Sequence, residues 1–219
     1  MNLLEPSLRD FSYLDCRRRA ELIGAEARNV TAGAVMIDVG GRGKPYAKLF
    51  EGRLSRHFVL DVETGQGVDV VADARQLPFA DGSVGAVLCT QVLEHIPEPV
   101  KVTCEIHRVL RPDGLLLLAV PAIFPQHGSP GDYWRFTPQG LEWMLRRFGR
   151  VDISAEAGTF ASFFLVFNMY LFLFSSWSPP LRRLIAWTLC PVNNVLGLLL
   201  GSLRRGKQFA SNFFVVAVR

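Results

Sequence analysis

The sequence of 219 residues predicts a doubly wound α/β fold, in which helices cover both faces of a mostly parallel sheet. Short apolar runs rich in β-branched residues alternate with segments of helical periodicity, as buried parallel strands and their crossover helices do. About fifty residues, far more than a hairpin needs, separate the last two expected strands, and most of them are apolar. We therefore expect a single domain over residues 1–219, with a hydrophobic helical insertion at 158–207, before the last strand.

Most of the expected strands are short apolar runs that begin or end near glycine, proline or aspartate, which end strands and open turns. In chain order these strands are residues 34–39, 58–61, 68–72, 84–89, 115–120, 151–154 and 209–218. Each expected helix has apolar side chains three or four positions apart. In chain order these helices are residues 14–29, 45–50, 97–110 and 137–148. Thr137 followed by Pro138 is typical of a helix N-cap with proline at the first helical position.

Composition and charge exclude a disordered chain and indicate an apolar surface. Hydrophobic residues make up 49% of the chain, charged residues only 20%, and the mean hydropathy is +0.21. Residues 1–156 carry 18 basic and 20 acidic side chains, whereas residues 157–219 carry six basic ones and no acidic one. A basic, apolar tail suits an anionic membrane surface better than a nucleic acid, so we expect no nucleic-acid partner.

The four cysteines indicate neither a disulfide framework nor a metal site. They show no CxxC or Cys/His ligand spacing, so we expect reduced thiols and no bound metal. Glu5 and Asp10 interrupt what would be the apolar region of a signal peptide. These features predict a cytoplasmic protein, with any membrane contact peripheral or monotopic.

Glycines and carboxylates follow successive expected strands, at the edge of the sheet where doubly wound folds bind ligands. Gly40 and Gly41 would let the backbone approach a ligand closely, and Asp61 ends the next strand, where a carboxylate can accept ribose hydroxyls. An adenosyl ligand explains this pattern most simply. NAD is disfavoured because the G-x-G-x-x-G fingerprint is missing.

Five blocks of sequence resemble class I S-adenosylmethionine-dependent methyltransferases of the ubiquinone and menaquinone biosynthesis type, which have a Rossmann-like fold. The blocks are residues 35–46, Asp61, residues 73–79, residues 92–95 and residues 107–114. The segment Lys44-Pro45-Tyr46 is similar to the corresponding segment in family members that act in polysaccharide and lipid-linked glycan pathways. The resemblance covers about residues 35–154 and the final strand.

The resemblance implies S-adenosylmethionine as cofactor and seven residues that bind it. Asp38, Gly40 and Gly41 would line its methionyl end, Asp61 would hold the ribose, Asp73 and Ala74 would border the adenine, and Gln91 would lie beside the sulfonium. Arg42 departs from the glycine that is usual in the family. At positive φ it would carry strain of about 1 kcal/mol, unless it pairs with the cofactor carboxylate.

The loop after the fifth expected strand, residues 124–136, carries the side chains that we expect to contact the methyl acceptor. Methyl transfer mainly needs alignment and exclusion of water, and a general base helps only where a hydroxyl must lose a proton. His127 is the preferred base, with Asp132 or Tyr133 in support. The alternative is that the aromatic residues of this loop form a packing plug. His95 opens a helical segment, which favours a structural role.

The insertion is too apolar to stay uncovered. Twelve of the fifteen side chains at 160–174 are large and apolar, and exposing them would cost roughly 18 to 36 kcal/mol. A second apolar stretch, 181–203, is interrupted by Pro191 and two asparagines and flanked by arginine pairs. Charged flanks and short helices favour a hairpin that dips into the inner leaflet. A homodimer interface, a lid over the acceptor and full spanning remain alternatives.

These features favour a membrane-associated methyltransferase that acts on a small or lipid-linked acceptor, such as a glycan or a quinone precursor. One rival is a soluble, dimeric methyltransferase of sugars or other small molecules. The other is a degenerate cofactor-binding scaffold at the membrane without activity, which Arg42 motivates.

Overall fold

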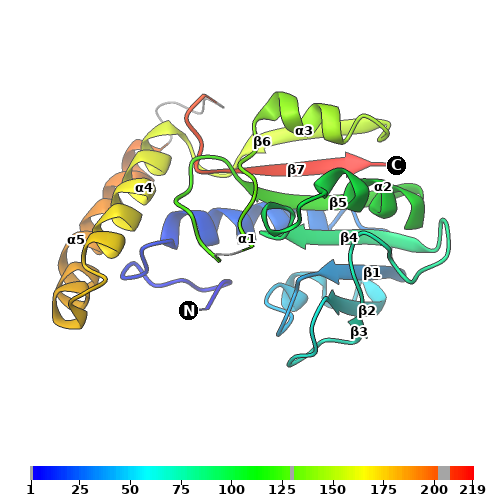
Figure 1. Cartoon of the computed structure of the whole chain (residues 1–219), viewed down its shortest axis with the longest axis horizontal. Helices are drawn as coiled ribbons and strands as arrows, with labels where there is room; N and C mark the ends of the chain where they lie inside the picture. Colours follow the sequence, from blue (N-terminus) through cyan, green and yellow to red (C-terminus); the bar gives the residue numbers. More distant parts are fainter. Residues whose placement is uncertain (1, 129–130, 202–207) are drawn as a thin grey trace.

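The computed structural model describes residues 2–128, 131–201 and 208–219, and its centre is a seven-stranded sheet in the order β3-β2-β1-β4-β5-β7-β6 (Figure 1). The strands are β1 (Ala34–Val39), β2 (Leu54–Asp61), β3 (Val70–Val71), β4 (Val84–Thr90), β5 (Leu110–Pro121), β6 (Arg150–Ala155) and β7 (Asn212–Val218). The helices are α1 (Tyr13–Ala27), α2 (Pro99–Val109), α3 (Pro138–Met144), α4 (Thr159–Phe174) and α5 (Pro179–Leu200), with short 3₁₀ turns at Ala47–Phe50 and Leu93–His95. The predicted doubly wound, mostly parallel fold is confirmed.

Parallel pairing brings the carboxyl ends of the central strands to one edge. β1 pairs in parallel with β2 and with β4, and β4 pairs in parallel with β5. β7 enters antiparallel between β5 and β6. In the sheet, β1 lies between β2 and β4, and the order in which strands are added changes direction at β1. In doubly wound folds a crevice opens at this point, beyond the carboxyl ends of the strands.

Helices cover both faces of the sheet with separate apolar cores. On one face α2 and α3 pack on the strands, with Val102, Ile106 and Leu141 fully buried. On the other face α1 contributes Ile23, which lies against the buried side of β1, β4 and β5. The predicted cap is confirmed, because the Thr137 hydroxyl accepts a hydrogen bond from the backbone N–H of Gly140 at 3.2 Å.

The expected insertion forms a helical hairpin, α4–α5, ahead of β7. Figure 1 shows it beyond the end of the sheet toward which β1 and β4 point, packed beside α1. Pro191 and the two asparagines, which interrupt the second apolar stretch of the sequence, do not end the helix, and α5 runs continuously through them. The asparagines are buried where they bond the two helices together. The end of the predicted insertion, including Arg204, Arg205 and Lys207, lies outside the described residues.

Polar side chains hold the hairpin together and tie it to the N-terminal segment. Asn193 donates to the side-chain oxygen of Asn168 at 2.7 Å, and Asn168 donates to that of Asn194 at 3.1 Å. Asn194 in turn donates to the backbone carbonyls of Leu8 and Asp10. Asn168 and Asn194 are fully buried, so these bonds fix how α4, α5 and the N-terminal segment meet.

Candidate active site

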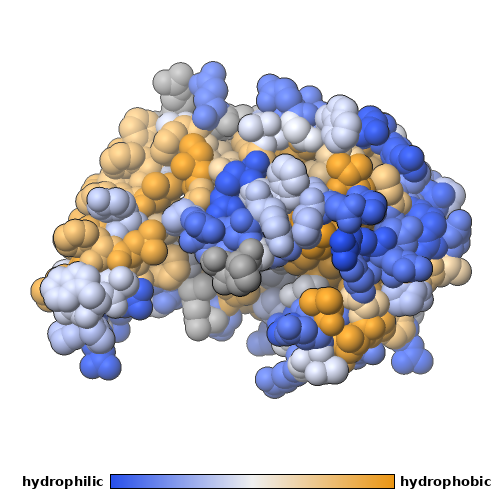
Figure 2. Space-filling view, viewed as in Figure 1, coloured by the Kyte–Doolittle hydropathy of each residue, from blue (hydrophilic) through white to orange (hydrophobic). Residues whose placement is uncertain are grey.

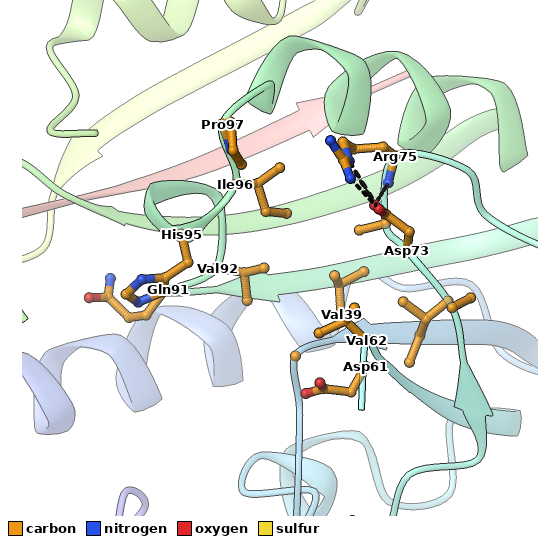
Figure 3. Close-up of a pocket in the computed structure, with 14 residues that line it drawn as sticks. Val39, Asp61, Val62, Asp73, Arg75, Gln91, Val92, His95, Ile96 and Pro97 are labelled. Atoms are coloured by element: carbon orange, nitrogen blue, oxygen red, sulfur yellow. Dashed lines mark hydrogen bonds and ion pairs between the residues drawn. The ribbon is translucent and has the colours of Figure 1, made fainter. Parts of the chain in front are cut away.

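A pocket of about 390 Å³ lies beyond the carboxyl ends of β1, β2 and β4. Five of the seven predicted cofactor residues line it: Gly40, Asp61, Asp73, Ala74 and Gln91. Figure 3 shows Gln91 and His95 together at one end of the pocket, Asp73 with Arg75 at the other, and Asp61 on a third side. The polar groups therefore surround an apolar middle formed by residues such as Val39 and Val92.

The glycines after β1 are required by close packing. Gly40 has φ of +72°, and a Cβ there would lie 2.4 Å from the Cγ2 atom of Val92. A Cβ on Gly41 would lie 2.1 Å from Cγ of Asp38, so the turn folds back against that carboxylate. Either substitution would push the turn out of place.

Asp38 is the buried charge next to this turn. Its side chain is 1% exposed and neither oxygen accepts a hydrogen bond from the described residues. The His57 Nε2 atom lies 3.5 Å from Oδ2, at the limit of a hydrogen bond. Burial raises the pKa of Asp38, and His57 opposes that shift. A carboxylate in this position needs a donor that the described residues do not supply.

Arg42 pairs with the predicted ribose-binding carboxylate. Its guanidinium contacts both oxygens of Asp61, at 2.8 and 2.7 Å, and reaches Glu63 at 3.1 Å. These hydrogen bonds lower the pKa of Asp61. The condition for strain at Arg42 does not arise, because Arg42 does not take positive φ: Gly43 and Lys44 take the left-handed conformation instead, with φ of +74° and +51°. Glycine adopts this conformation without strain, so the strain of the turn lies at Lys44.

At the end of the pocket away from Gln91 and His95, Asp73 is paired with an arginine, as Asp61 is. The Arg75 guanidinium donates to both oxygens of Asp73 at 2.6 to 3.0 Å, and to Glu98 at 2.9 Å. These bonds lower the pKa of Asp73. Ala74 is buried between them and the apolar wall of the pocket. This end can hold a flat apolar ring with polar groups at its rim.

Gln91 adopts a left-handed backbone conformation, with φ of +55°, directly after β4. Such strain in a residue other than glycine is typical of functional turns. Its side chain donates to Asn212 at 3.4 Å, and Asn212 donates to the buried carboxylate of Asp15 on α1. Ser211 also donates to Asp15, at 2.8 Å. α1 thus positions the end of the pocket where Gln91 lies.

The loop after β5 does not line the pocket with its predicted catalytic side chains. Asp132 is held by Arg135, at 2.6 and 2.8 Å, and by the backbone N–H of His127 at 2.7 Å. Hydrogen bonding to Arg135 lowers the pKa of Asp132 well below its usual range. Tyr133 is 54% exposed, and its backbone N–H donates to the Glu94 carbonyl. The catalytic roles of His127, Asp132 and Tyr133 remain predictions.

Sequence reasoning missed a cluster that joins this loop to the pocket. Glu94 is fully buried in the turn after β4, and burial raises its pKa. Nε2 of His127 lies 3.8 Å from Glu94 Oε1, and Nε2 of His95 lies 4.0 Å from the same atom. His95, which sequence analysis assigned a structural role, lines the pocket. The signal in the sequence was a glutamate directly after the apolar residues Val92 and Leu93.

Comparison with known proteins agrees with this geometry. A sequence family described as a methyltransferase domain matches residues 38–118, from β1 to β5. The chain contains a methyltransferase domain. S-adenosylmethionine is the cofactor of such domains, and the predicted resemblance to class I S-adenosylmethionine-dependent methyltransferases is confirmed.

Relatives of the methyltransferase domain include both uncharacterised and named proteins. An uncharacterised methyltransferase of Mycobacterium sp. (strain KMS) is 34% identical over 111 residues, which are 46% of this chain and 44% of that one. A ubiquinone/menaquinone biosynthesis C-methyltransferase of Desulfotalea psychrophila is 36% identical over 111 residues, 45% of each chain. The chain thus spans less than half the length of the curated relatives it matches.

A solved structure shares the fold over nearly the whole chain. The S-adenosylmethionine-dependent methyltransferase of Archaeoglobus fulgidus superposes with a TM-score of 0.55 and 15% identity, covering 91% of this chain and 94% of that one. The likeness therefore extends beyond the residues that the sequence family matches.

The residues of the methyltransferase domain fit the cofactor. Asp38 has unsatisfied acceptors beside a glycine turn, as a site for a cationic ammonium group would. Asp61 and Asp73 present carboxylates on two sides of an apolar pocket, which suits a nucleoside with hydroxyls at one edge. Arg42 is exposed enough to leave Asp61, with 45% of its side chain open to solvent.

Proposed function

We propose that this protein transfers a methyl group from S-adenosylmethionine to a small or lipid-linked acceptor at a membrane surface. One observation carries the proposal: the pocket and an uncovered apolar hairpin lie at the same end of the sheet. Among the described residues, fifteen of the twenty-two exposed large hydrophobic side chains belong to residues 160–199. Figure 2 has hydrophobic residues gathered over this hairpin, at the left of the molecule.

The methyl transfer needs few chemical groups from the protein. S-adenosylmethionine supplies a methyl carbon activated by a positively charged sulfur. Asp38 would hold the ammonium end, Asp61 the ribose hydroxyls and Ala74 the adenine, as the resemblance implies. Gln91 would orient the acceptor near the sulfur, and the loop with His127 would exclude water or accept a proton.

A lipid-linked acceptor fits this arrangement because the hairpin can meet acyl chains while the pocket stays in water. Exposed aromatic residues of the hairpin, such as Trp177 and Trp187, are of the type that sits at membrane interfaces. α5 is the one helix of the described segments that has the length and composition to cross a membrane. Its arginines, Arg182 and Arg183, favour a position in the interface facing anionic lipids.

Cofactor binding is the first test. Calorimetry with S-adenosylmethionine should give one site per chain, and Asp61→Ala should weaken binding more than about tenfold, because the ribose hydroxyls lose their acceptor. Asp152→Ala is the matched control, since this carboxylate on β6 is exposed, pairs with its neighbour Arg150 and lies outside the pocket. Absence of binding in the wild type would favour the degenerate scaffold.

Membrane contact is tested by flotation with anionic vesicles. The double variant Trp177→Ser/Trp187→Ser should reduce the bound fraction, because both side chains are more than 60% exposed on the hairpin. Trp143→Ser is the control, since Trp143 is 59% exposed on α3, away from the hairpin. A stable dimer in solution that ignores vesicles would support the soluble, dimeric alternative instead.

A further inference from the structure

The turn after β4 and the loop after β5 bring three potential metal ligands together. The carboxylate of Glu94 and the imidazoles of His95 and His127 each offer one atom, and these atoms all lie within 4.8 Å of one another. Ligands of one cation are about 3 to 3.5 Å apart when each lies about 2.1 Å from it. Small side-chain adjustments would bring this cluster to that spacing.

The buried carboxylate of Glu94 lacks a hydrogen-bond partner in the part of the chain that the structure describes. Glu94 is fully buried, and neither of its oxygens accepts a hydrogen bond from any described residue. The nearest guanidinium of the loop belongs to Arg135, whose donors are used by Asp132 and by backbone carbonyls. An unpaired buried carboxylate is costly, whereas one that binds a cation is satisfied.

Both histidines present the same nitrogen to Glu94. The Nδ1 atom of His95 lies 2.5 Å from the carbonyl oxygen of Gly131, so Nδ1 carries the proton and Nε2 is free to act as a ligand. The Nδ1 atom of His127 lies 3.3 Å from the Pro125 carbonyl and 3.7 Å from Asp132, two acceptors that favour the same tautomer over the single donor Arg135 at 3.5 Å. Metal-binding histidines are held in this way by carbonyls or carboxylates.

The loop is shaped to keep His95 in place. Gly128 has φ of +68°, and a Cβ there would lie 2.8 Å from Cε1 of His95. The ring of His127 meets that of His95 edge-on, with centroids 5.1 Å apart. On its other side His127 contacts Phe124, at 5.1 Å between ring centroids. Packing thus fixes both rings as well as their tautomers.

We propose that Glu94, His95 and His127 bind one divalent transition-metal cation, with Zn²⁺ the best match to two imidazoles and one carboxylate. Three protein ligands leave at least one coordination position for an oxygen atom. The two imidazoles are about one-third exposed while Glu94 is closed off, so this position faces the open side of the cluster. His95 also lines the cofactor pocket, which connects the cation to the site of methyl transfer.

The cation would let the proposed methyltransferase use a hydroxyl group as the methyl acceptor, and this part of the inference rests on the proposed function. A hydroxyl bound to the cation releases its proton to solvent. Its oxygen then forms a bond to the methyl carbon as the carbon–sulfur bond breaks and leaves its electron pair on sulfur. The products are a methyl ether and S-adenosylhomocysteine. His127 is then a ligand and not the general base.

Metal binding is measured on the untagged full chain with Zn²⁺ alone and with Co²⁺ as a spectroscopic probe. We expect one cation per chain, a visible Co²⁺ band of a site with nitrogen ligands, and no competition by Mg²⁺. Glu94→Gln, His95→Gln and His127→Gln should each weaken binding at least about tenfold. His107→Gln is the control, because His107, on α2, meets the ring of Phe148 edge-on and takes no part in the cluster.

The outcomes separate the cation site from the proposed function. Absence of Zn²⁺ binding in the wild type, or unchanged affinity in all three variants, would overturn the cation site. If a variant fails to fold, X-ray absorption of the wild-type Zn²⁺ complex decides: two imidazoles support the site, and a shell with none or one overturns it. Calorimetry with S-adenosylmethionine on the metal-free chain tests the proposed function separately.

Discussion

The pair between Arg42 and Asp61 is the residue-scale feature that bears most directly on cofactor binding. The guanidinium occupies both oxygens that ribose hydroxyls would use, yet nearly half of the Arg42 side chain is exposed. Ion pairs this exposed are weak, because solvent screens them. We therefore propose that Arg42 competes with the cofactor for Asp61 and that the cofactor displaces it.

We expect Arg42→Ala to lower the dissociation constant for S-adenosylmethionine by about two- to fivefold, since Asp61 no longer has to release its partner. Calorimetry at constant ionic strength measures the change, and Arg150→Ala, whose pair with Asp152 is exposed on β6, is the control. Weaker binding in Arg42→Ala would instead mean that Arg42 contacts the cofactor. This is the alternative raised in the sequence analysis, in which Arg42 pairs with the cofactor carboxylate.

Asp15 makes the stability of the fold depend on pH. Burial raises its pKa to about 7, assisted by Glu156 and opposed by Arg19, Ser211 and Asn212. Between about pH 4 and pH 7 the folded chain therefore holds a proton that the unfolded chain has released. The contribution of Asp15 to stability is full below that window and is lost as the pH rises through 7.

We expect Asp15→Asn to remove this contribution to the pH dependence. The difference in unfolding free energy between wild type and variant should shift in favour of the variant by on the order of a few kcal/mol from pH 4.5 to pH 8. Urea unfolding of both proteins at several pH values measures it. A difference that stays constant with pH would show that Asp15 titrates normally in the folded chain.

At the scale of elements, β1 and β4 were predictable because short β-branched runs ending in glycine or a turn define buried strands locally. β2 begins at Leu54, four residues earlier than expected, because pairing with β1 extends it into polar sequence. β3 keeps only two residues. Pairing with the neighbouring strand sets where β2 and β3 begin and end, and the local sequence holds no information about that pairing.

The candidate site was predictable where it follows strand ends and unpredictable where it depends on contacts across the fold. Asp61 and Gln91 line the pocket, since Asp61 ends β2 and Gln91 directly follows β4. Glu94 and His127 are 33 positions apart and meet because the loop after β5 folds back on the turn after β4. Such a meeting is a tertiary property, and spacing rules for metal ligands miss it.

The α4–α5 hairpin depends on its buried asparagines as much as on its apolar residues. Asn168→Leu would remove the partners of Asn193 and Asn194, whose amide groups are buried. We expect a loss of about 1–3 kcal/mol in unfolding free energy, measured by chemical denaturation. Asn29→Leu, which removes only an exposed bond to Glu26, should change stability by less than about 0.5 kcal/mol. Equal effects of the two variants would contradict this account of the hairpin.

At the scale of the whole molecule, the part of the sequence that contains the apolar hairpin is also the part with a positive net charge. The first 156 residues carry a slight excess of acidic groups, whereas the last 63 carry only basic ones and include the apolar hairpin. Anionic lipids would attract the hairpin side of the chain and repel the remainder. The charge distribution thus favours the proposed membrane contact in one orientation, with the hairpin toward the lipid and most of the matched methyltransferase domain away from it.

Two kinds of attraction should then contribute to vesicle binding. Salt screens the attraction between arginines and anionic lipid headgroups but leaves hydrophobic burial of the hairpin intact. Raising NaCl from about 0.05 to 0.5 M shortens the Debye length about threefold, so partitioning onto anionic vesicles should fall at least about tenfold and then level off above zero. Flotation across the salt series measures this, with neutral vesicles as the reference for the apolar part alone. Complete loss of binding at high salt would mean that the exposed aromatic side chains never enter the lipid, and the hairpin would then need a protein partner to cover it.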